Sequence, residues 1–168
     1  MSPRRLAIIG ALVAMSGCAQ CSGALADPLR GAWRIDSMHL ITTGRDTVTL
    51  KVNESLVTFG SGYYSISYCF GKDRPATYAE RWRPSDEEKL ARFRTVIMNS
   101  GTYRLKGHRI DAKPLFALAP EFVDGRAIFS YQLVKDTLEL TWEKSIAFDG
   151  LEYPSAGTVT LLRLTRIH

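Results

Sequence analysis

The sequence has few of the residues on which metal sites, disulfide frameworks and recognised catalytic motifs depend. Its 168 residues include 3 cysteines and 3 histidines. The cysteines form no C-x-x-C pattern with a histidine, so we expect no structural zinc site and no bound metal. The G-x-S-x-G, H-E-x-x-H, P-loop and dinucleotide-binding patterns are also missing. We therefore expect no cofactor, and the sequence points to no established enzyme class.

Long apolar runs and blocks of charge are scarce as well. The most apolar stretch, Leu6–Met15, is about half of the roughly 20 residues that a transmembrane helix needs. The formal net charge is +5, and acidic and basic residues are interspersed along the chain. A mild, evenly mixed charge gives no support for nucleic-acid binding.

Residues 1–26 have the pattern of an export signal that is removed from the mature protein. Arg4 and Arg5 precede the apolar stretch Leu6–Met15, and Ala24-Leu25-Ala26 is a small-x-small cleavage pattern. This pattern predicts a mature domain over residues 27–168 in the periplasm. Loss of the two leader arginines would lower the net charge from +5 to +3.

A second processing site competes with the first. Met15-Ser16-Gly17-Cys18 resembles a bacterial lipobox, although leucine is the usual residue where Met15 stands. In that case residues 1–17 are removed, Cys18 carries the lipid, and membrane contact is through this N-terminal anchor alone. The two alternatives stay open at this point.

The choice between them decides the cysteine content. Cleavage after Ala26 leaves Cys69 alone, whereas lipidation retains Cys21 as an oxidisable partner for it. Cys69 lies in a strand-like run, which favours a buried, inert thiol over a nucleophile.

Alternation of apolar and polar residues predicts a chain made almost wholly of short strands. In the run 63–70, for example, Tyr64, Ile66, Tyr68 and Phe70 share one face. Glycine, proline and Lys-Asp turn signals separate the runs. The predicted strands are 29–35, 46–52, 56–59, 63–70, 102–105, 108–118 with an interruption at Pro114, 127–134, 137–142 and 158–166.

One amphipathic helix interrupts this pattern. Ser85-Asp86-Glu87-Glu88 is a capping box, in which the serine and Glu88 side chains bond reciprocally to backbone amides. Leu90, Phe93, Val96 and Ile97 recur at helical spacing, and Asn99–Gly101 reads as the stop. The spacing predicts about three turns, with an apolar stripe that needs a sheet or a barrel mouth to lie on.

About 8–10 short strands and a single helix indicate an all-β, antiparallel up-and-down β-barrel. Closure of the sheet removes both exposed edges. A barrel of eight strands is just wide enough to be filled by side chains or to hold one small ligand.

The order and spacing of several short motifs resemble the lipocalin-like domain proteins of bacteria and fungi. The resemblance covers most of residues 29–166. It departs from the family pattern at Ala112 and Lys113, where the family tends to carry histidines, so no role of those histidines is transferred. The motifs are Leu29-x-Gly31-x-Trp33-x-Ile35-x-Ser37, Gly62-Tyr63-Tyr64-Ser65, Asp73-Arg74-Pro75, Glu87-Glu88, Gly101-Thr102-Tyr103, Pro120-x-Phe122-Val123, Asp136-x-Leu138-x-Leu140 and Leu162-x-Leu164-x-Arg166.

The resemblance implies how the barrel is closed at one end. In lipocalins an arginine of the last strand packs across the tryptophan of the first strand, and alternation permits the same for Arg166 and Trp33. Gly31 would let another backbone approach closely, and Trp33 would fill the space so created. Such a cation–π contact is structural, and it places any ligand site at the opposite end, near Arg74 and the helix after Ser85.

The resemblance and the aromatic residues together predict a barrel that binds a small hydrophobic or amphipathic molecule. Two alternatives stay open. In the first, the same aromatics fill the barrel and leave it a structural or envelope-interaction role. In the second, a buried Asp, Glu or His inside the barrel serves an isomerase- or cyclase-like acid–base reaction. The predicted ligand-binding residues are Tyr64, Tyr68, Arg74, Tyr103, Phe129, Tyr131 and Trp142.

Overall fold

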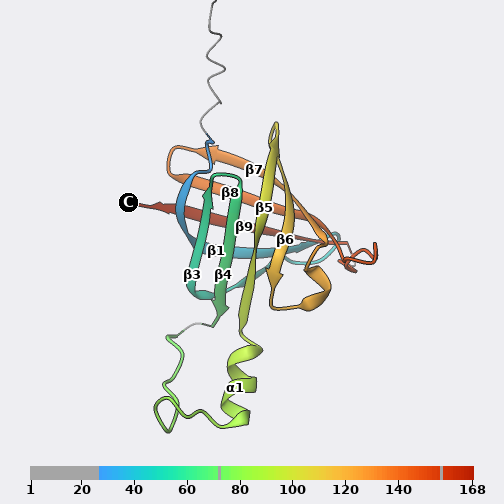
Figure 1. Ribbon diagram of the computed structural model, residues 1–168. Coiled ribbons are helices and arrows are strands. Elements are labelled where there is room, and N and C mark those ends of the chain that lie inside the picture. The colour runs from blue at the N-terminus through green and yellow to red at the C-terminus, as the bar shows by residue number, and fades with distance from the viewer. Residues whose placement is uncertain (1–26, 72, 156) are drawn as a thin grey trace, which may run out of the picture.

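The chain folds into one closed antiparallel β-barrel with a single α-helix, as the sequence predicts (Figure 1). The computed structural model describes residues 27–71, 73–155 and 157–168. The predicted export signal and Cys18 lie outside the described residues. The elements are β1 (Gly31–Thr42), β2 (Val48–Leu50), β3 (Val52–Gly60), β4 (Tyr63–Phe70), α1 (Asp86–Phe93), β5 (Val96–Lys106), β6 (Arg109–Ala117), the short 3-10 helix η1 (Pro120–Phe122), β7 (Arg126–Val134), β8 (Thr137–Ile146) and β9 (Thr158–Ile167).

Pairing of the first and last strands closes the barrel. β1 runs antiparallel to β9 along almost its whole length, from Ala32 opposite Ile167 to Thr42 opposite Thr158. On its other side β1 pairs first with β3 and then with β2. Only Lys51 separates β2 from β3, so these two behave as one broken strand of an eight-strand barrel. Closure therefore gives each long strand a neighbour on both sides over at least part of its length.

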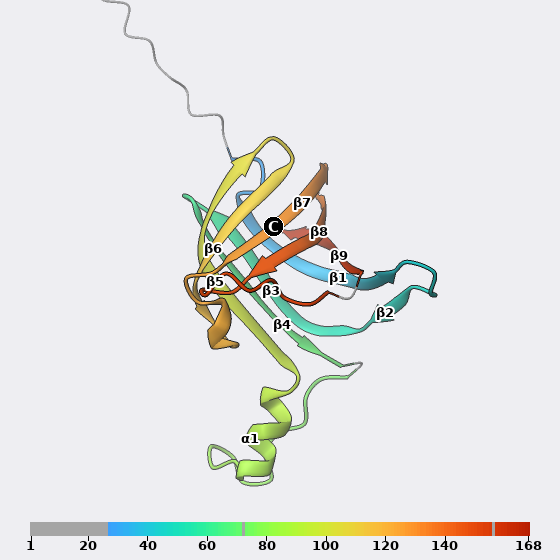
Figure 2. The ribbon, with the colours of Figure 1, turned by 90° about the vertical axis from the view of Figure 1, so that its right-hand side faces the viewer.

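The two ends of the barrel are built differently (Figures 1 and 2). One end carries the tight β3–β4, β5–β6 and β7–β8 hairpins and the start of the described chain, and we call it the closed end. The other carries the longer connections through α1, η1 and residues 147–157, and we call it the open end. Figure 2 shows the β1–β2 hairpin extending beyond the barrel wall.

Trp33 fills the closed end, as the resemblance implies. Its side chain is fully buried, and its indole N–H donates to the Leu29 carbonyl oxygen at 2.9 Å. The Arg166 guanidinium carbon lies 4.1 Å from the centre of the indole ring. A side chain on Gly31 would start 2.7 Å from Arg166 Nη1, so glycine leaves the arginine room to lie there.

Arg166 also connects the segment before β1 to the barrel. Its Nη1 donates to the Arg30 carbonyl oxygen at 2.6 Å, and its Nε lies 3.3 Å from the Asp136 carboxylate. This one side chain therefore covers the indole and joins the β7–β8 turn to the segment that leads into β1.

The predicted break at Pro114 is a bulge within a continuous strand. β6 runs through Pro114, and the register with β5 shifts between Ser100 and Gly101. At Gly101 an added Cβ would lie 2.0 Å from the Lys113 carbonyl oxygen, so the two backbones approach more closely than any side chain allows. The shift leaves Leu115 without a partner on β5, and a proline is tolerated beside such a bulge.

The helix begins at the predicted residue but is shorter than the predicted three turns. Ser85 and Glu88 form the predicted capping box at its start. The helix ends at Phe93, however, and Val96 and Ile97 belong to β5. The run Thr95-Val96-Ile97 is β-branched, and such residues favour strands, which here outweighs the helical spacing.

The apolar side of α1 is not covered in the way the sequence predicts. None of its residues is buried, and Leu90 and Phe93 remain about half exposed. Figure 1 shows α1 standing off the open end of the barrel. Among the helices of the described residues, neither α1 nor η1 has the length and apolarity to cross a bilayer.

Candidate ligand-binding cavity

The open half of the barrel encloses a cavity of about 900 Å³. Its walls come from strands all round the barrel, including β1, β4, β5, β7, β8 and β9. Phe93, Phe122 and Pro154, from three different connections of the open end, line its entrance. The volume lies near the upper end of the range of about 300–1,000 Å³ that is typical of small-molecule sites.

An aromatic and aliphatic wall surrounds this space. The predicted inward row of β4 lines it from Tyr64 to Phe70 through Ile66 and Tyr68. Phe129 of β7 and Trp142 of β8 face the same cavity, with ring centres 6.3 Å apart. Trp142 in turn stacks on Tyr153 at 6.0 Å. An apolar wall with few polar groups is the usual lining of a small-molecule pocket.

Four of the seven predicted ligand residues line the cavity, namely Tyr64, Tyr68, Phe129 and Trp142. Tyr103 and Tyr131 face the barrel interior but are buried in the packed closed half, so they are not among the lining residues. Tyr103 packs edge-on against Phe59 at 5.3 Å and its hydroxyl bonds to the Asp27 carboxylate.

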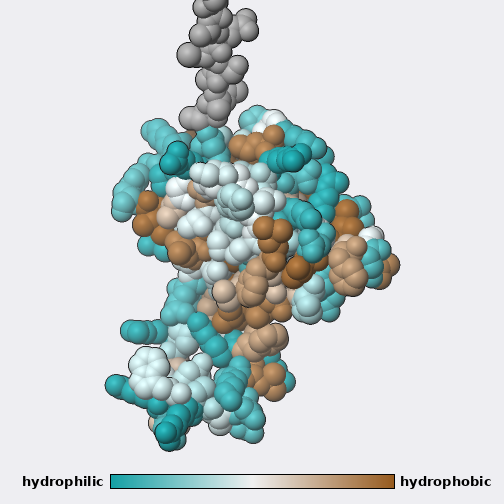
Figure 3. Space-filling view, viewed as in Figure 1, coloured by the Kyte–Doolittle hydropathy of each residue, from teal (hydrophilic) through white to brown (hydrophobic). Residues whose placement is uncertain are grey.

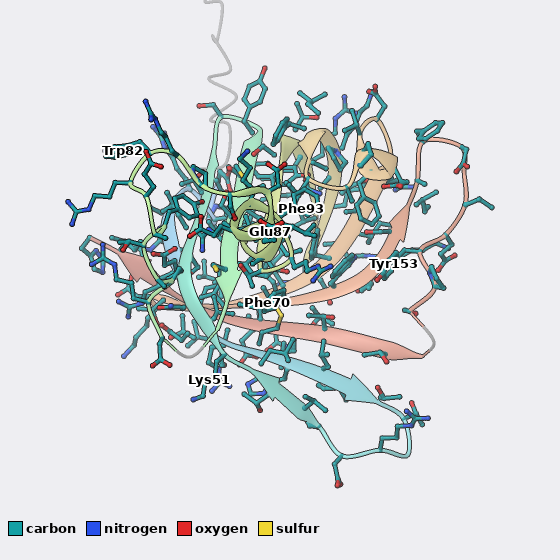
Figure 4. All side chains as sticks on the ribbon, turned by 90° about the horizontal axis from the view of Figure 1, so that it is seen from below. Lys51, Phe70, Trp82, Glu87, Phe93 and Tyr153 are labelled. Carbon is teal, nitrogen blue, oxygen red and sulfur yellow. The ribbon has the colours of Figure 1, made fainter. Side chains whose placement is uncertain are left out.

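Arg74 is the third predicted residue outside the cavity wall. It is exposed on the connection between β4 and α1. The corner Asp73-Arg74-Pro75 leaves the barrel instead of folding over its mouth, and Figure 4, which views the molecule from below, shows this connection swinging wide around α1. Trp82, on the same connection, is 93% exposed.

Two polar pairs interrupt the apolar wall. The Tyr64 hydroxyl donates to Asn99 Oδ1 at 2.6 Å, and the Trp142 indole N–H donates to the Ser145 hydroxyl at 2.9 Å. Asn99 and Ser145 both line the cavity. The sequence interpretation missed Asn99 because it took Asn99–Gly101 as a helix stop; the β-branched run before it was the signal for a strand.

Burial keeps the cavity tyrosines protonated. Burial raises the pKa of Tyr68 from 10.0 to about 12, and it also raises the pKa of Tyr64 well above its usual range. The Tyr64 hydroxyl is therefore a hydrogen-bond donor at any physiological pH, and the tyrosines of this wall do not supply a tyrosinate base.

Burial of Tyr68 makes the protein less stable in alkali. Unfolded tyrosine loses its proton above pH 10, whereas folded Tyr68 keeps its proton up to about pH 12. Ionisation therefore favours the unfolded chain, and the free energy of unfolding falls as the pH rises from 10 to 12. In urea titrations across this range, we expect Tyr68→Phe to reduce that fall by about 2–3 kcal/mol. Tyr63→Phe, at a position that is 61% exposed, is the control for the loss of one phenol hydroxyl from β4.

Charged groups at the cavity walls are largely neutralised. Lys144 pairs with Glu152, and Glu143 pairs with Arg109 at 2.6 Å. Arg94 and Glu121 remain, one of each sign, and neither makes an ion pair within the part of the chain that the structure describes. Among the described residues, the entrance therefore carries no cluster of unpaired cationic side chains.

The surface around the entrance is unusually apolar. Phe93 is 55% exposed, and Phe116 of β6 and Tyr153 are exposed to a similar extent. Figure 3 shows apolar surface where the lower barrel meets α1. In Figure 4 the labelled Phe70 lies on β4, Tyr153 lies on the connection between β8 and β9, and Phe93 lies on α1.

Cys69 faces away from the cavity. It is buried on the outer side of β4, where its Sγ lies 2.9 Å from Arg92 Nη1 and 3.5 Å from the Thr95 hydroxyl. It makes no disulfide with any described residue. Within residues 27–71, 73–155 and 157–168, no group of three or more histidine, cysteine or acidic side chains is arranged to hold a metal ion.

Comparison with known proteins does not place the chain in a family. Neither a family model nor a curated protein matches it.

Proposed function

We propose that this protein is an exported lipocalin-like barrel that binds or carries one small hydrophobic or amphipathic molecule in the cavity of its open half. The observation that carries this proposal is the apolar cavity of about 900 Å³ with an entrance at one end. The export pattern of residues 1–26 and the lipobox-like Met15–Cys18 support a location in the bacterial envelope, free or lipid-anchored.

The contrast between the two halves of the barrel supports binding over simple packing. The closed half is filled by the buried side chains of Leu29, Trp33, Phe59, Tyr103 and Tyr131. The open half leaves room for a ligand although its walls are just as rich in large side chains. A rigid frame with a preformed apolar space reduces the entropy lost on binding.

Filling the cavity with a side chain should abolish binding. Ala117 lines the cavity opposite Asn99 in the neighbouring strand, so Ala117→Trp places an indole in the space. We expect at least about tenfold weaker binding of N-phenyl-1-naphthylamine, a neutral fluorescent probe of apolar sites, since one steric block removes most of the contact area. Fluorescence titration of the purified domain measures this affinity.

A matched variant separates blocking from a general effect of an added tryptophan. Val134 is 68% exposed at the β7–β8 turn of the closed end, and Val134→Trp should leave probe affinity within twofold of wild type. Equal affinity of wild type and Ala117→Trp would contradict binding in the barrel. Folded wild type that binds no apolar probe would contradict the proposed function itself.

A further inference from the structure

The cavity wall contains a neutral hydrogen-bonding group that apolar packing alone does not require. Asn99 lies on β5 opposite Ile66, between the inward positions of Tyr64 and Tyr68 on the adjacent strand. Its amide lines the cavity. An asparagine amide in such a wall is costly unless its donors and acceptor are satisfied.

The protein satisfies the oxygen acceptor of this amide with a hydrogen bond. The Tyr64 hydroxyl donates to Oδ1 at 2.6 Å, which fixes the orientation of the amide plane. The two N–H donors on Nδ2 make no hydrogen bond with the described residues. The raised pKa of Tyr64 keeps its hydroxyl in the donating form, so this orientation does not change with pH in the physiological range.

The charges of the cavity decide between a neutral and an anionic partner for these donors. Among the described residues, the Asn99 side chain hydrogen-bonds to Tyr64 and to no cationic group. Of the cationic side chains that line the cavity, Lys144 is paired with Glu152, and Arg94 is accompanied by one residue of opposite charge, Glu121. A carboxylate brought beside Asn99 would lose its hydration without gaining an opposite charge, which is far more costly than the burial of a neutral carbonyl.

On the basis of the proposed function, we infer that the ligand is an uncharged lipid-like molecule whose carbonyl oxygen accepts a hydrogen bond from Asn99 Nδ2, with its hydrocarbon part along the aromatic wall. Ester, ketone and amide carbonyls share this chemistry. Asn99 is then the residue that distinguishes such a molecule from a plain hydrocarbon and from a fatty-acid anion, and Tyr64 is a positioning residue for its amide.

Three matched probes test this inference through displacement of N-phenyl-1-naphthylamine at neutral pH. Methyl laurate, laurate and dodecane share a hydrocarbon chain of closely similar length and differ in the group that Asn99 would meet. We expect methyl laurate to bind about three- to tenfold more tightly than dodecane, the range of one neutral hydrogen bond. Laurate should bind at least about tenfold more weakly than methyl laurate, because its charge must be buried.

Two variants assign this preference to the amide. Asn99→Leu should bring methyl laurate to within twofold of dodecane, and Tyr64→Phe, which removes the hydroxyl that orients the amide, should reduce the preference by about half. Gln132→Leu is the matched control, because Gln132 is an exposed amide on β7 and its loss should leave all three affinities unchanged. If Asn99→Leu unfolds, Tyr64→Phe still provides the test.

The outcomes separate the inference from the proposed function. If dodecane and methyl laurate bind equally well to wild type, or if laurate binds most tightly, the inference is wrong and the proposed function stands. Full retention of the ester preference in folded Asn99→Leu, or in Tyr64→Phe where Asn99→Leu does not fold, also overturns it. If folded wild type binds none of the three and not the probe either, the proposed function fails and the inference fails with it.

Discussion

Replacing Trp33 by alanine will lower the free energy of unfolding by about 3–5 kcal/mol, the range for removal of a large buried aromatic side chain. Trp33 is fully buried, and the same indole carries the Leu29 hydrogen bond and the cation–π contact with Arg166. Alanine would leave a cavity at the closed end and would leave Arg166 without the ring on which it lies. Urea unfolding followed by circular dichroism measures this loss.

Trp82→Ala is the matched control for this variant. Trp82 is 93% exposed on the connection between β4 and α1, so its removal should change the free energy of unfolding by no more than about 0.5 kcal/mol. Probe binding separates the two ends of the barrel. If Trp33→Ala kept its stability and lost ligand binding, the assignment of Trp33 to the closed end and of the ligand to the open end would be wrong.

Replacing Gly101 by alanine will lower stability by about 3 kcal/mol or more, above the usual cost of adding one methyl group to a packed interior. The added Cβ would start 2.0 Å from the Lys113 carbonyl oxygen and 2.8 Å from the Pro114 Cα atom. Both neighbours are backbone atoms, so no side-chain rotation relieves the clash, and β5 and β6 must move apart at the bulge.

Gly60→Ala provides the comparison for Gly101→Ala. Gly60 ends β3, and an added Cβ there would meet no atom within 4 Å. We expect its unfolding midpoint in urea to stay close to that of wild type. A Gly101→Ala protein as stable as the Gly60→Ala protein would show that the close approach of β5 and β6 is not required.

Alternation within the sequence was sufficient to predict most of the barrel. The strands 63–70 and 127–134 were predicted within one residue of β4 and β7, because each shows an unbroken alternation between turn signals. The secondary structure of residues 95–101 was harder to predict. Leu90, Phe93, Val96 and Ile97 fit a helix by spacing, and only pairing with β4 selects the strand from Val96 onward. In this stretch the spacing of the apolar residues favoured a helix and the β-branched residues favoured a strand. Hydrogen bonding to β4 selected the strand.

The candidate site was predicted in part for a similar reason. Alternation assigns Tyr64, Tyr103 and Tyr131 alike to the inside of the barrel, and all three side chains do face inward. It carries no information about depth along the barrel axis, which follows from the register between strands and from their tilt. Tyr103 and Tyr131 therefore lie in the filled half, and only Tyr64 reaches the cavity.

The sequence by itself determined the all-β class and the capped start of the helix, because both depend on short-range spacing or on a motif. The pairing of Arg166 with Trp33 was implied by the family resemblance, and the structure shows it. Only the tertiary structure decided that the barrel is filled at one end and hollow at the other, and that Asn99 faces the hollow half. The size of a cavity and the depth of a residue depend on contacts between strands that are distant in the chain, and no local pattern records them.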